Sequence, residues 1–174
     1  MLTPALMLLI LTTPYLLARF VARRGRRVDP EAAAAWGAGL LFLFTASGHF
    51  IQTAAMVQML PAWVPGREPL VYATGVLELA IAVLLLRARW RKAGAWAAVW
   101  VLIVFFPANI HAALQHVPFG GHAWGPIYLL VRGPLQLFII VWIWARILRV
   151  TPNCATSPRL ADSPCAEVLI WRPL

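Results

Sequence analysis

Six polar side chains interrupt long apolar stretches of this sequence, and their types suit the binding or protonation of a small molecule. They are His49, Gln52, Glu78, Asn109, Arg132 and Gln136. An ionisable group at membrane depth costs about 2.5 to 3.5 kcal/mol even on a lenient insertion scale, so each one is expected to have a partner or a function. Arginine and histidine donate hydrogen bonds, and a glutamate takes up a proton. The set therefore predicts a ligand-binding site made of these six residues.

Residue patterns for catalysis or metal binding are missing from the sequence. It contains no nucleophile–base pair, phosphate loop, haem signature or redox-active dithiol. Cys154 and Cys165 stand in a polar tail without the spacing of a metal site or a disulfide framework. His111, His116 and His122 fit no common zinc signature, and we expect them to be solvated at the outer face. No catalytic residue and no metal site is assigned, and whether the protein is an enzyme stays open.

The composition argues against a water-soluble protein. Of 174 residues, 61% are hydrophobic and 12% are charged, about half the charged share of a soluble domain. A surface this poor in charge must mostly face lipid, so an integral membrane protein is expected. The net charge of +9 would suggest nucleic-acid binding in a soluble protein, but here the basic residues cluster between apolar runs. That clustering is typical of cytoplasmic loops facing anionic lipid, so no nucleic-acid partner is expected.

Five apolar runs are long enough to cross a bilayer, which takes about 20 helical residues. They predict an all-α transmembrane bundle over residues 1–150, with helices at about 2–22, 32–58, 70–87, 93–115 and 126–148. A cleaved signal peptide is the alternative for the first run, but arginines follow this run and no basic residue precedes it, which favours a retained helix. Residues 151–174 carry four prolines and no helical or strand period, so a disordered tail is expected there.

The basic residues set the expected orientation. Thirteen of the 15 lysines and arginines fall in the tail or next to the connections after the first, third and fifth helices, and only Arg67 and Arg132 fall on the other side. Because basic loops stay in the cytoplasm, the amino terminus is predicted outside and the carboxyl terminus inside. We expect a multi-pass protein of a bacterial inner (plasma) membrane.

This orientation places the polar residues at similar depths. His49, Asn109 and Arg132 come from three helices, yet all fall in the outer half of the bilayer, with Glu78 at mid-depth. The six residues would then form one cluster open toward the outside. Three alternatives stay open: Arg132 as an interfacial anchor, Gln52 as a helix cap, and a Glu78–Arg132 pair that only holds helices together. Glu78 needs Arg132 or His49 as a partner, or else a proton.

Several short motifs lie in a fixed order along the chain. They are His49-Phe50, the Pro61-x-Trp63-x-Pro65 loop, Gly75-x-x-Glu78, Pro107-Ala108-Asn109 and Arg132-x-Pro134-x-Gln136. In order and spacing they resemble the DoxX family of small bacterial membrane proteins, which have a four-helix core. The resemblance covers about residues 33–148, with a glycine after Arg132 where leucine is more usual. The first helix and the tail lie outside it.

The resemblance implies a connection with redox enzymes, because the DoxX family is named after a subunit of a thiosulfate:quinone oxidoreductase. The first hypothesis is an accessory subunit of a membrane redox system, in which a quinone is the one candidate cofactor. Arg132 and His49 would donate hydrogen bonds to a quinone carbonyl, Glu78 would hold them or take the proton, and Asn109 would fix the orientation. A partner oxidoreductase subunit and a homo-oligomer are the protein associations considered.

A different class of function stays open. More distant relatives of the DoxX family resemble cargo receptors and receptor-assembly chaperones, which catalyse nothing. The second hypothesis is therefore a membrane scaffold or assembly chaperone whose polar cluster is structural. A transporter is disfavoured because five helices allow no even inverted repeat.

Overall fold

The computed structural model describes residues 2–118 and 121–149, and this part of the chain is helical without strands. The segments are α1 (Leu2–Arg23), α2 (Pro30–Ile51), α3 (Thr53–Gln58), α4 (Arg67–Leu86), η1 (Ala88–Trp90), α5 (Arg91–Leu114), η2 (His122–Tyr128), α6 (Leu129–Ile143) and η3 (Trp144–Leu148). Within these residues, five segments are long and apolar enough to span a membrane, which confirms the predicted all-α bundle. The expected tail at 151–174, with Cys154 and Cys165, lies outside the described residues.

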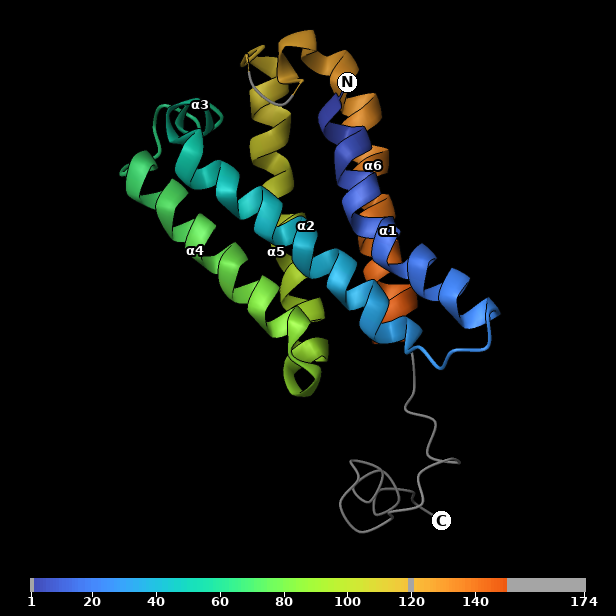
Figure 1. Ribbon diagram of the computed structural model, residues 1–174. Helices are drawn as coiled ribbons and strands as arrows, with labels where there is room; N and C mark the ends of the chain where they lie inside the picture. The colour runs from blue at the N-terminus through green and yellow to red at the C-terminus, as the bar shows by residue number, and fades with distance from the viewer. Residues whose placement is uncertain (1, 119–120, 150–174) are drawn as a thin grey trace, which may run out of the picture.

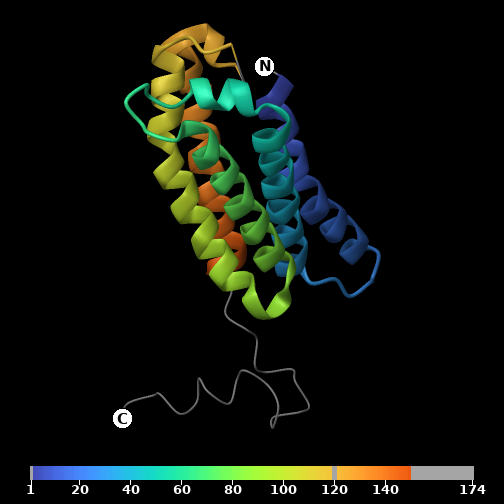
Figure 2. The same cartoon turned by 90° about the vertical axis from the view of Figure 1, so that its left-hand side faces the viewer.

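The long helices form one bundle with two distinct ends. Helices α2 and α4 run side by side, and α1 packs along α2 (Figure 1). Helix α3 and the η2 turn lie at the end where α1 begins, which we call the α3/η2 end (Figure 2). The α1–α2 and α4–α5 connections lie at the opposite end, which carries most of the described arginines and is called the basic end.

The beginning of α2 shows why the chain turns at the basic end. The Asp29 carboxylate accepts a hydrogen bond of 2.9 Å from the Glu31 backbone amide, and Pro30 occupies the first turn, where no amide donor is needed. Arg91, at the beginning of α5, lies 3.4 Å from Glu31 Oε1 and 3.8 Å from Asp29 Oδ2. The α2 cap therefore also ties the beginning of α5 to the beginning of α2.

Small residues allow α2 and α4 to approach closely beside Glu78. A Cβ atom added at Gly75 would lie 2.7 Å from His49 Cβ and 3.1 Å from the Phe50 ring. Gly75 itself is buried. The close approach brings the α2 face that carries His49 against the α4 face that carries Glu78.

The predicted helix over 32–58 is wrong in one respect, because it is broken at Gln52. Gln52 takes φ −123° and ψ 35°, and α3 lies across the end of the bundle instead of continuing α2 (Figure 2). The hydroxyl of Thr53 donates 2.6 Å to the His49 carbonyl, which the amide of residue 53 would otherwise use in a continuous helix. The local hydroxyl bond offers the backbone an alternative to the next helical turn.

The last predicted helix, at 126–148, also differs in detail. Residues 122–128 form a tight turn in which Gly125 takes φ 69° and ψ −151°, and regular α-helix begins only at Leu129. Past Ile143 the chain widens into the π-helical turn η3. The first, third and fourth predicted helices match α1, α4 and α5 to within a few residues.

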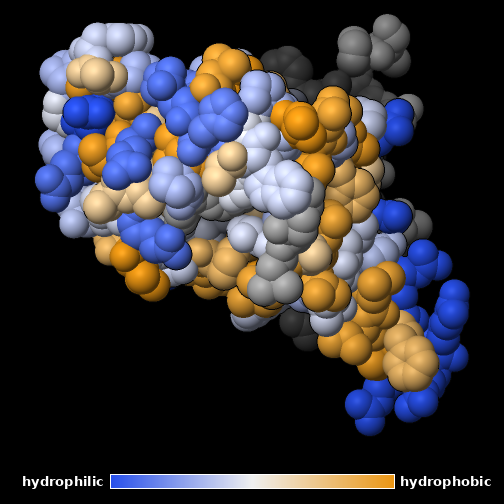
Figure 3. Space-filling view, turned by 90° about the horizontal axis from the view of Figure 1, so that it is seen from above, coloured by the Kyte–Doolittle hydropathy of each residue, from blue (hydrophilic) through white to orange (hydrophobic). Residues whose placement is uncertain are grey.

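Apolar side chains cover much of the outside of the bundle. Leu9, Val76, Trp100 and Leu130, from four different helices, are between 58% and 76% exposed. Seen from the α3/η2 end, hydrophilic side chains gather on one side of this end and at the far end of α1, and hydrophobic side chains lie between them and along the edges (Figure 3). Such a surface is unfavourable in water and favourable in lipid.

Candidate functional site

All six predicted site residues line one cavity. It has a volume of about 930 Å³, and α1, α2, α3, α4, α5 and α6 all contribute to its wall near the α3/η2 end. Most of the wall is apolar, with Leu41, Phe42, Phe105 and Ile139 among its members. The structure thus brings together side chains that are up to 87 positions apart, from His49 to Gln136.

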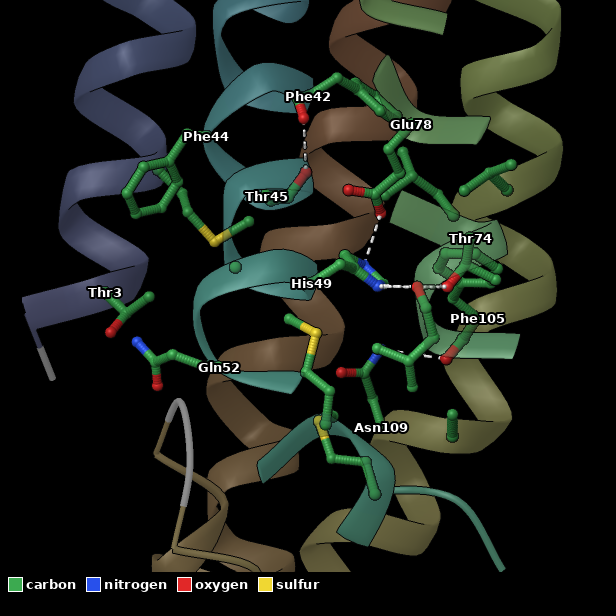
Figure 4. A pocket seen from close by; sticks show the side chains of 18 of the residues that line it. Thr3, Phe42, Phe44, Thr45, His49, Gln52, Thr74, Glu78, Phe105 and Asn109 are labelled. Atoms are coloured by element: carbon green, nitrogen blue, oxygen red, sulfur yellow. Dashed lines mark hydrogen bonds and ion pairs between the residues drawn. The ribbon is translucent and has the colours of Figure 1, made fainter. Parts of the chain in front are cut away.

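The deepest polar contact joins His49 to Glu78. His49 Nε2 lies 3.6 Å from Glu78 Oε1, and the two side chains are 12% and 7% exposed. They face each other from α2 and α4 in the wall of the cavity (Figure 4). The second carboxylate oxygen, Glu78 Oε2, is buried and has no hydrogen-bond partner in the described part of the chain.

The other side of the His49 ring fixes its tautomer. Nδ1 lies 3.0 Å from the Val71 carbonyl, which can only accept, so Nδ1 carries a hydrogen and donates it. Thr74 Oγ1 lies 3.1 Å from the same nitrogen and directs its own hydrogen to the carbonyls of Leu70 and Val71. A neutral His49 therefore presents a bare Nε2 to Glu78.

The facing atoms of His49 and Glu78 can both act as acceptors unless one of them carries a hydrogen. A bare Nε2 and an ionised carboxylate would be two acceptors facing each other at 3.6 Å with no donor between them. The proton must lie either on His49, giving an imidazolium–carboxylate pair, or on Glu78, giving a carboxylic acid. Either arrangement places one hydrogen between the two facing atoms.

Arg132 is the main correction to the expected site. Its Nη1 donates to Met7 Sδ at 3.4 Å, across the cavity in α1, and its Nε is buried without a hydrogen-bond partner among the described residues. Among the described ion pairs within 4 Å none joins Arg132 to Glu78, so of the alternatives left open for Glu78 the structure shows His49, and not Arg132, at ion-pair distance. The interfacial-anchor alternative fails as well, because the guanidinium turns into the cavity wall toward α1.

Gln136 and Asn109 are already hydrogen-bonded within the bundle. Gln136 Nε2 donates 2.7 Å to the Leu102 carbonyl in α5, one residue before the Ile103 carbonyl that Pro107 leaves without its helical donor. Asn109 Nδ2 donates 3.1 Å to the Phe105 carbonyl, and its amide oxygen points into the cavity (Figure 4). His49 Nδ1 and Asn109 Nδ2 thus already have protein acceptors.

Gln52 lies at the mouth of the cavity and is exposed. It is the C-cap residue of α2, and its backbone amide bonds the Gly48 carbonyl at 2.8 Å. The helix-cap alternative for Gln52 thus describes its backbone, while its side chain belongs to the cavity lining.

One residue that sequence reasoning placed in solvent is part of the cavity wall. His122 is only 3% exposed, and its ring packs edge-on against Tyr128 with centroids 4.9 Å apart. The η2 turn folds over the end of the bundle, and two glycines, Gly121 just before it and Gly125 inside it, take positive φ. These glycines, together with Pro126, were the signal for a compact turn. His111 is half-buried and lies 3.0 Å from the Met59 carbonyl, so it is not a solvated group either.

Methionines are a second feature of the wall that the sequence did not reveal. Met7, Met56 and Met59 all line the cavity. Thioether side chains are flexible and polarizable, so they adapt to ligands of different shape. Within the described residues, no group of three or more His, Cys, Asp or Glu side chains is placed to hold a metal ion.

Comparison with known proteins gives a family and no activity. A family model described as Domain of unknown function (DUF8561) matches residues 38–147, and the chain belongs to this family. The match contains all six predicted site residues and leaves α1 outside it. No curated protein and no solved structure matches the chain.

Proposed function

We propose that this protein is an integral membrane protein that binds a small molecule, most specifically a quinone headgroup, in the 930 Å³ cavity. One observation carries the proposal. The cavity wall contains a buried donor, Arg132 Nε, and a buried acceptor, Glu78 Oε2. Neither atom has a hydrogen-bond partner in the described part of the chain. A buried polar atom without a partner costs about 1 to 3 kcal/mol, so a ligand that supplies both an acceptor and a donor is favoured.

The membrane part of the proposal rests on surface and charge. The five long apolar helices expose large hydrophobic side chains, and the connections rich in arginine lie together at the basic end (Figure 1). Because basic loops stay in the cytoplasm, the α3/η2 end would face outward, with the amino terminus outside and the carboxyl terminus inside. The site would then open toward the outer half of a bacterial inner membrane.

A quinone fits the chemistry of the cavity in both of its redox forms. The oxidised ring has carbonyl oxygens that would accept from Arg132 Nε, and the reduced ring has hydroxyls that would donate to Glu78 Oε2. His49 would hold the Glu78 carboxylate in place beside the ring. The apolar and methionine side chains would contact the ring and the isoprenoid tail.

The DoxX-like motifs supply the context of this proposal. They favour an accessory subunit of a membrane redox system, in which a partner oxidoreductase carries out the electron chemistry and this chain binds the quinone. Association of several copies of the chain belongs to the same proposal.

A scaffold function is the second candidate, and a specific observation favours it. Gln136 bonds the Leu102 carbonyl across two helices, and Asn109 bonds Phe105 within α5. These two polar side chains stabilise the bundle with or without a ligand. A purely structural cluster, however, would not leave Arg132 Nε and Glu78 Oε2 without partners.

Titration of the purified protein with a short-chain benzoquinone tests the proposal. Arg132→Met keeps the aliphatic volume but removes the donors, and it should weaken quinone binding by about tenfold or more, because a hydrogen bond from a charged group contributes about 1.5 to 3 kcal/mol. Arg67→Met is the matched control, since it makes the same change outside the cavity. Quenching of tryptophan fluorescence reports the affinity.

Glu78→Gln provides an independent arm of the same experiment. It should weaken binding of the reduced quinol more than binding of the quinone, because the quinol hydroxyl needs the carboxylate as its acceptor. The proposal is contradicted if the unmodified protein does not bind the benzoquinone, or if Arg132→Met and Arg67→Met bind it equally well.

A further inference from the structure

A second, smaller cavity lies at the basic end, between the end of α1 and the beginning of α2. Its volume is about 400 Å³. Two arginines, Arg19 and Arg23, line it together with Tyr15 and with the apolar side chains of Ala18, Ala22 and Val28. The space thus combines positive charge on one side with apolar surface on the other.

The two arginines carry charge that the described part of the chain does not neutralise. They lie one helical turn apart on the same face of α1, where like charges repel each other by a few tenths of a kcal/mol. The carboxylates closest in sequence, Asp29 and Glu31, both face Arg91 instead. Arg19 and Arg23 have no carboxylate within 4 Å among the described residues. An anion between them would relieve the repulsion and supply the missing counter-charge.

Tyr15, in the wall beside the arginines, is packed against an aromatic ring and a further cation. Tyr15 is 6% exposed, and its ring packs edge-on against Trp142 with centroids 5.2 Å apart. The Arg146 guanidinium stacks over the Tyr15 ring at 4.7 Å. Positive charge therefore approaches Tyr15 from α1 and from the η3 turn, while the aromatic pair holds the wall in place.

The outer face of α1 next to this cavity is apolar. Leu16 and Leu17 are each 59% exposed, and Phe20 is 52% exposed. Figure 3 shows the same juxtaposition, with hydrophobic and hydrophilic side chains side by side at the far end of α1. A soluble anion would use the arginines only, whereas a phospholipid would use the arginines and the apolar face.

We propose that the cavity between α1 and α2 is a binding site for the headgroup of one anionic phospholipid. The phosphate lies between Arg19 and Arg23, and the acyl chains extend along the apolar face of α1. The site rests on the proposed membrane insertion, but it is independent of any ligand in the larger cavity. It also gives a reason for the charge of α1, which the family match leaves outside.

Competitive lipid binding to the full chain in detergent, measured by native mass spectrometry, tests the site. The protein is offered equal amounts of phosphatidylglycerol and phosphatidylcholine. The unmodified protein should retain one phosphatidylglycerol. Arg19→Gln/Arg23→Gln should weaken that binding by about 25-fold, because each arginine near an anionic lipid contributes about fivefold. Arg26→Gln/Arg27→Gln removes the same charge from the neighbouring connection, outside the cavity, and should change binding by less than about twofold.

Three results would overturn the proposal. Equal losses in the two double variants would mean that general positive charge attracts the lipid. Retention of phosphatidylcholine as strongly as phosphatidylglycerol would exclude a headgroup site. Displacement of the lipid by excess inorganic phosphate would identify a site for a free anion.

A charge-preserving variant is the control for misfolding. Arg19→Lys/Arg23→Lys keeps both positive charges and should retain most of the phosphatidylglycerol binding. If this variant loses binding as completely as the glutamine variant while melting at the same temperature as the unmodified protein, charge is not what holds the lipid and the proposal is wrong.

Discussion

At the scale of single residues, some buried polar atoms of the cavity have hydrogen-bond partners within the protein and others have none in the described part of the chain. Counting along the helices was enough to predict that Glu78 lies deep and needs a partner. It did not show whether that partner is His49 or Arg132, because the answer depends on how each helix is rotated about its own axis. The side chain of Arg132 turns toward Met7, 125 positions away in a helix that the motifs do not cover. No local pattern encodes such a contact.

The pairing of Glu78 can be tested by comparing two double-mutant cycles. Glu78→Ala and His49→Ala should couple by about 1 kcal/mol or more, because in the described part of the chain each removes the other's only ion-pair partner within 4 Å. Glu78→Ala and Arg132→Ala should couple less, since no ion pair within 4 Å joins them in the described residues. Unfolding in detergent measures the five free-energy changes, for the three single and the two double variants. A larger coupling to Arg132 than to His49 would contradict the geometry of the site.

A substitution at Gln136 tests whether a polar side chain of the cavity is structural or binds the ligand. Gln136→Leu should lower the free energy of unfolding by about 1 kcal/mol or more, because it leaves the Leu102 carbonyl without its 2.7 Å donor. It should leave benzoquinone affinity within a few-fold of that of the unmodified protein, since the Gln136 amide is committed to α5. Stability and affinity are measured on the same preparation. A variant that keeps full stability and loses the ligand would show that Gln136 acts on the ligand.

At the scale of the elements, the number and order of the long helices could be predicted from length and hydropathy. The break at Gln52 could not, because no proline or glycine marks it and the Thr53 hydroxyl competes with the helix for the His49 carbonyl. The same limit applies to η2, whose fold over the end of the bundle buries His122. Periodicity reports a helix and its length, but it does not report where a short segment turns across a bundle.

The close approach of α2 and α4 makes a prediction about one glycine. Gly75→Ala should destabilise the protein by about 1 to 3 kcal/mol, because the new methyl group would lie 2.7 Å from His49 Cβ and force the two helices apart. Gly133→Ala is the matched control, since its methyl group would lie 4.0 Å from the nearest side-chain atom, in Phe106. It should be neutral or stabilising, because alanine favours helix over glycine. Thermal unfolding in detergent gives both values, and equal destabilisation would contradict the packing.

At the scale of the whole molecule, sidedness and depth together predicted that the six polar residues would meet. The described arginine-rich connections do lie at one end of the bundle, and the six residues line one cavity toward the other (Figure 1). The cavity itself could not be predicted from the sequence, because a polar cluster can also be tightly packed with no space between its side chains. Its size depends on how the six helices that line it pack against one another.

The orientation of the whole molecule gives a further prediction. A reporter that is active only in the cytoplasm should be active when fused after Arg149 and inactive when inserted near Gly66. The reason is that basic connections stay inside and the number of crossings is odd. A reporter that is active only outside should give the reverse pattern. Cytoplasmic activity near Gly66 would contradict the orientation and place the large cavity at the inner face.

The most direct measurement of the central claim is the quinone content of the protein as purified from its own membrane. Extraction and mass spectrometry should find about one quinone per chain in the unmodified protein and in Arg67→Met. Arg132→Met should insert and elute normally yet carry little quinone, because the ligand carbonyl has lost its donor. If the unmodified protein carries no quinone, or if Arg132→Met carries as much as the unmodified protein, then the cavity is not a quinone site.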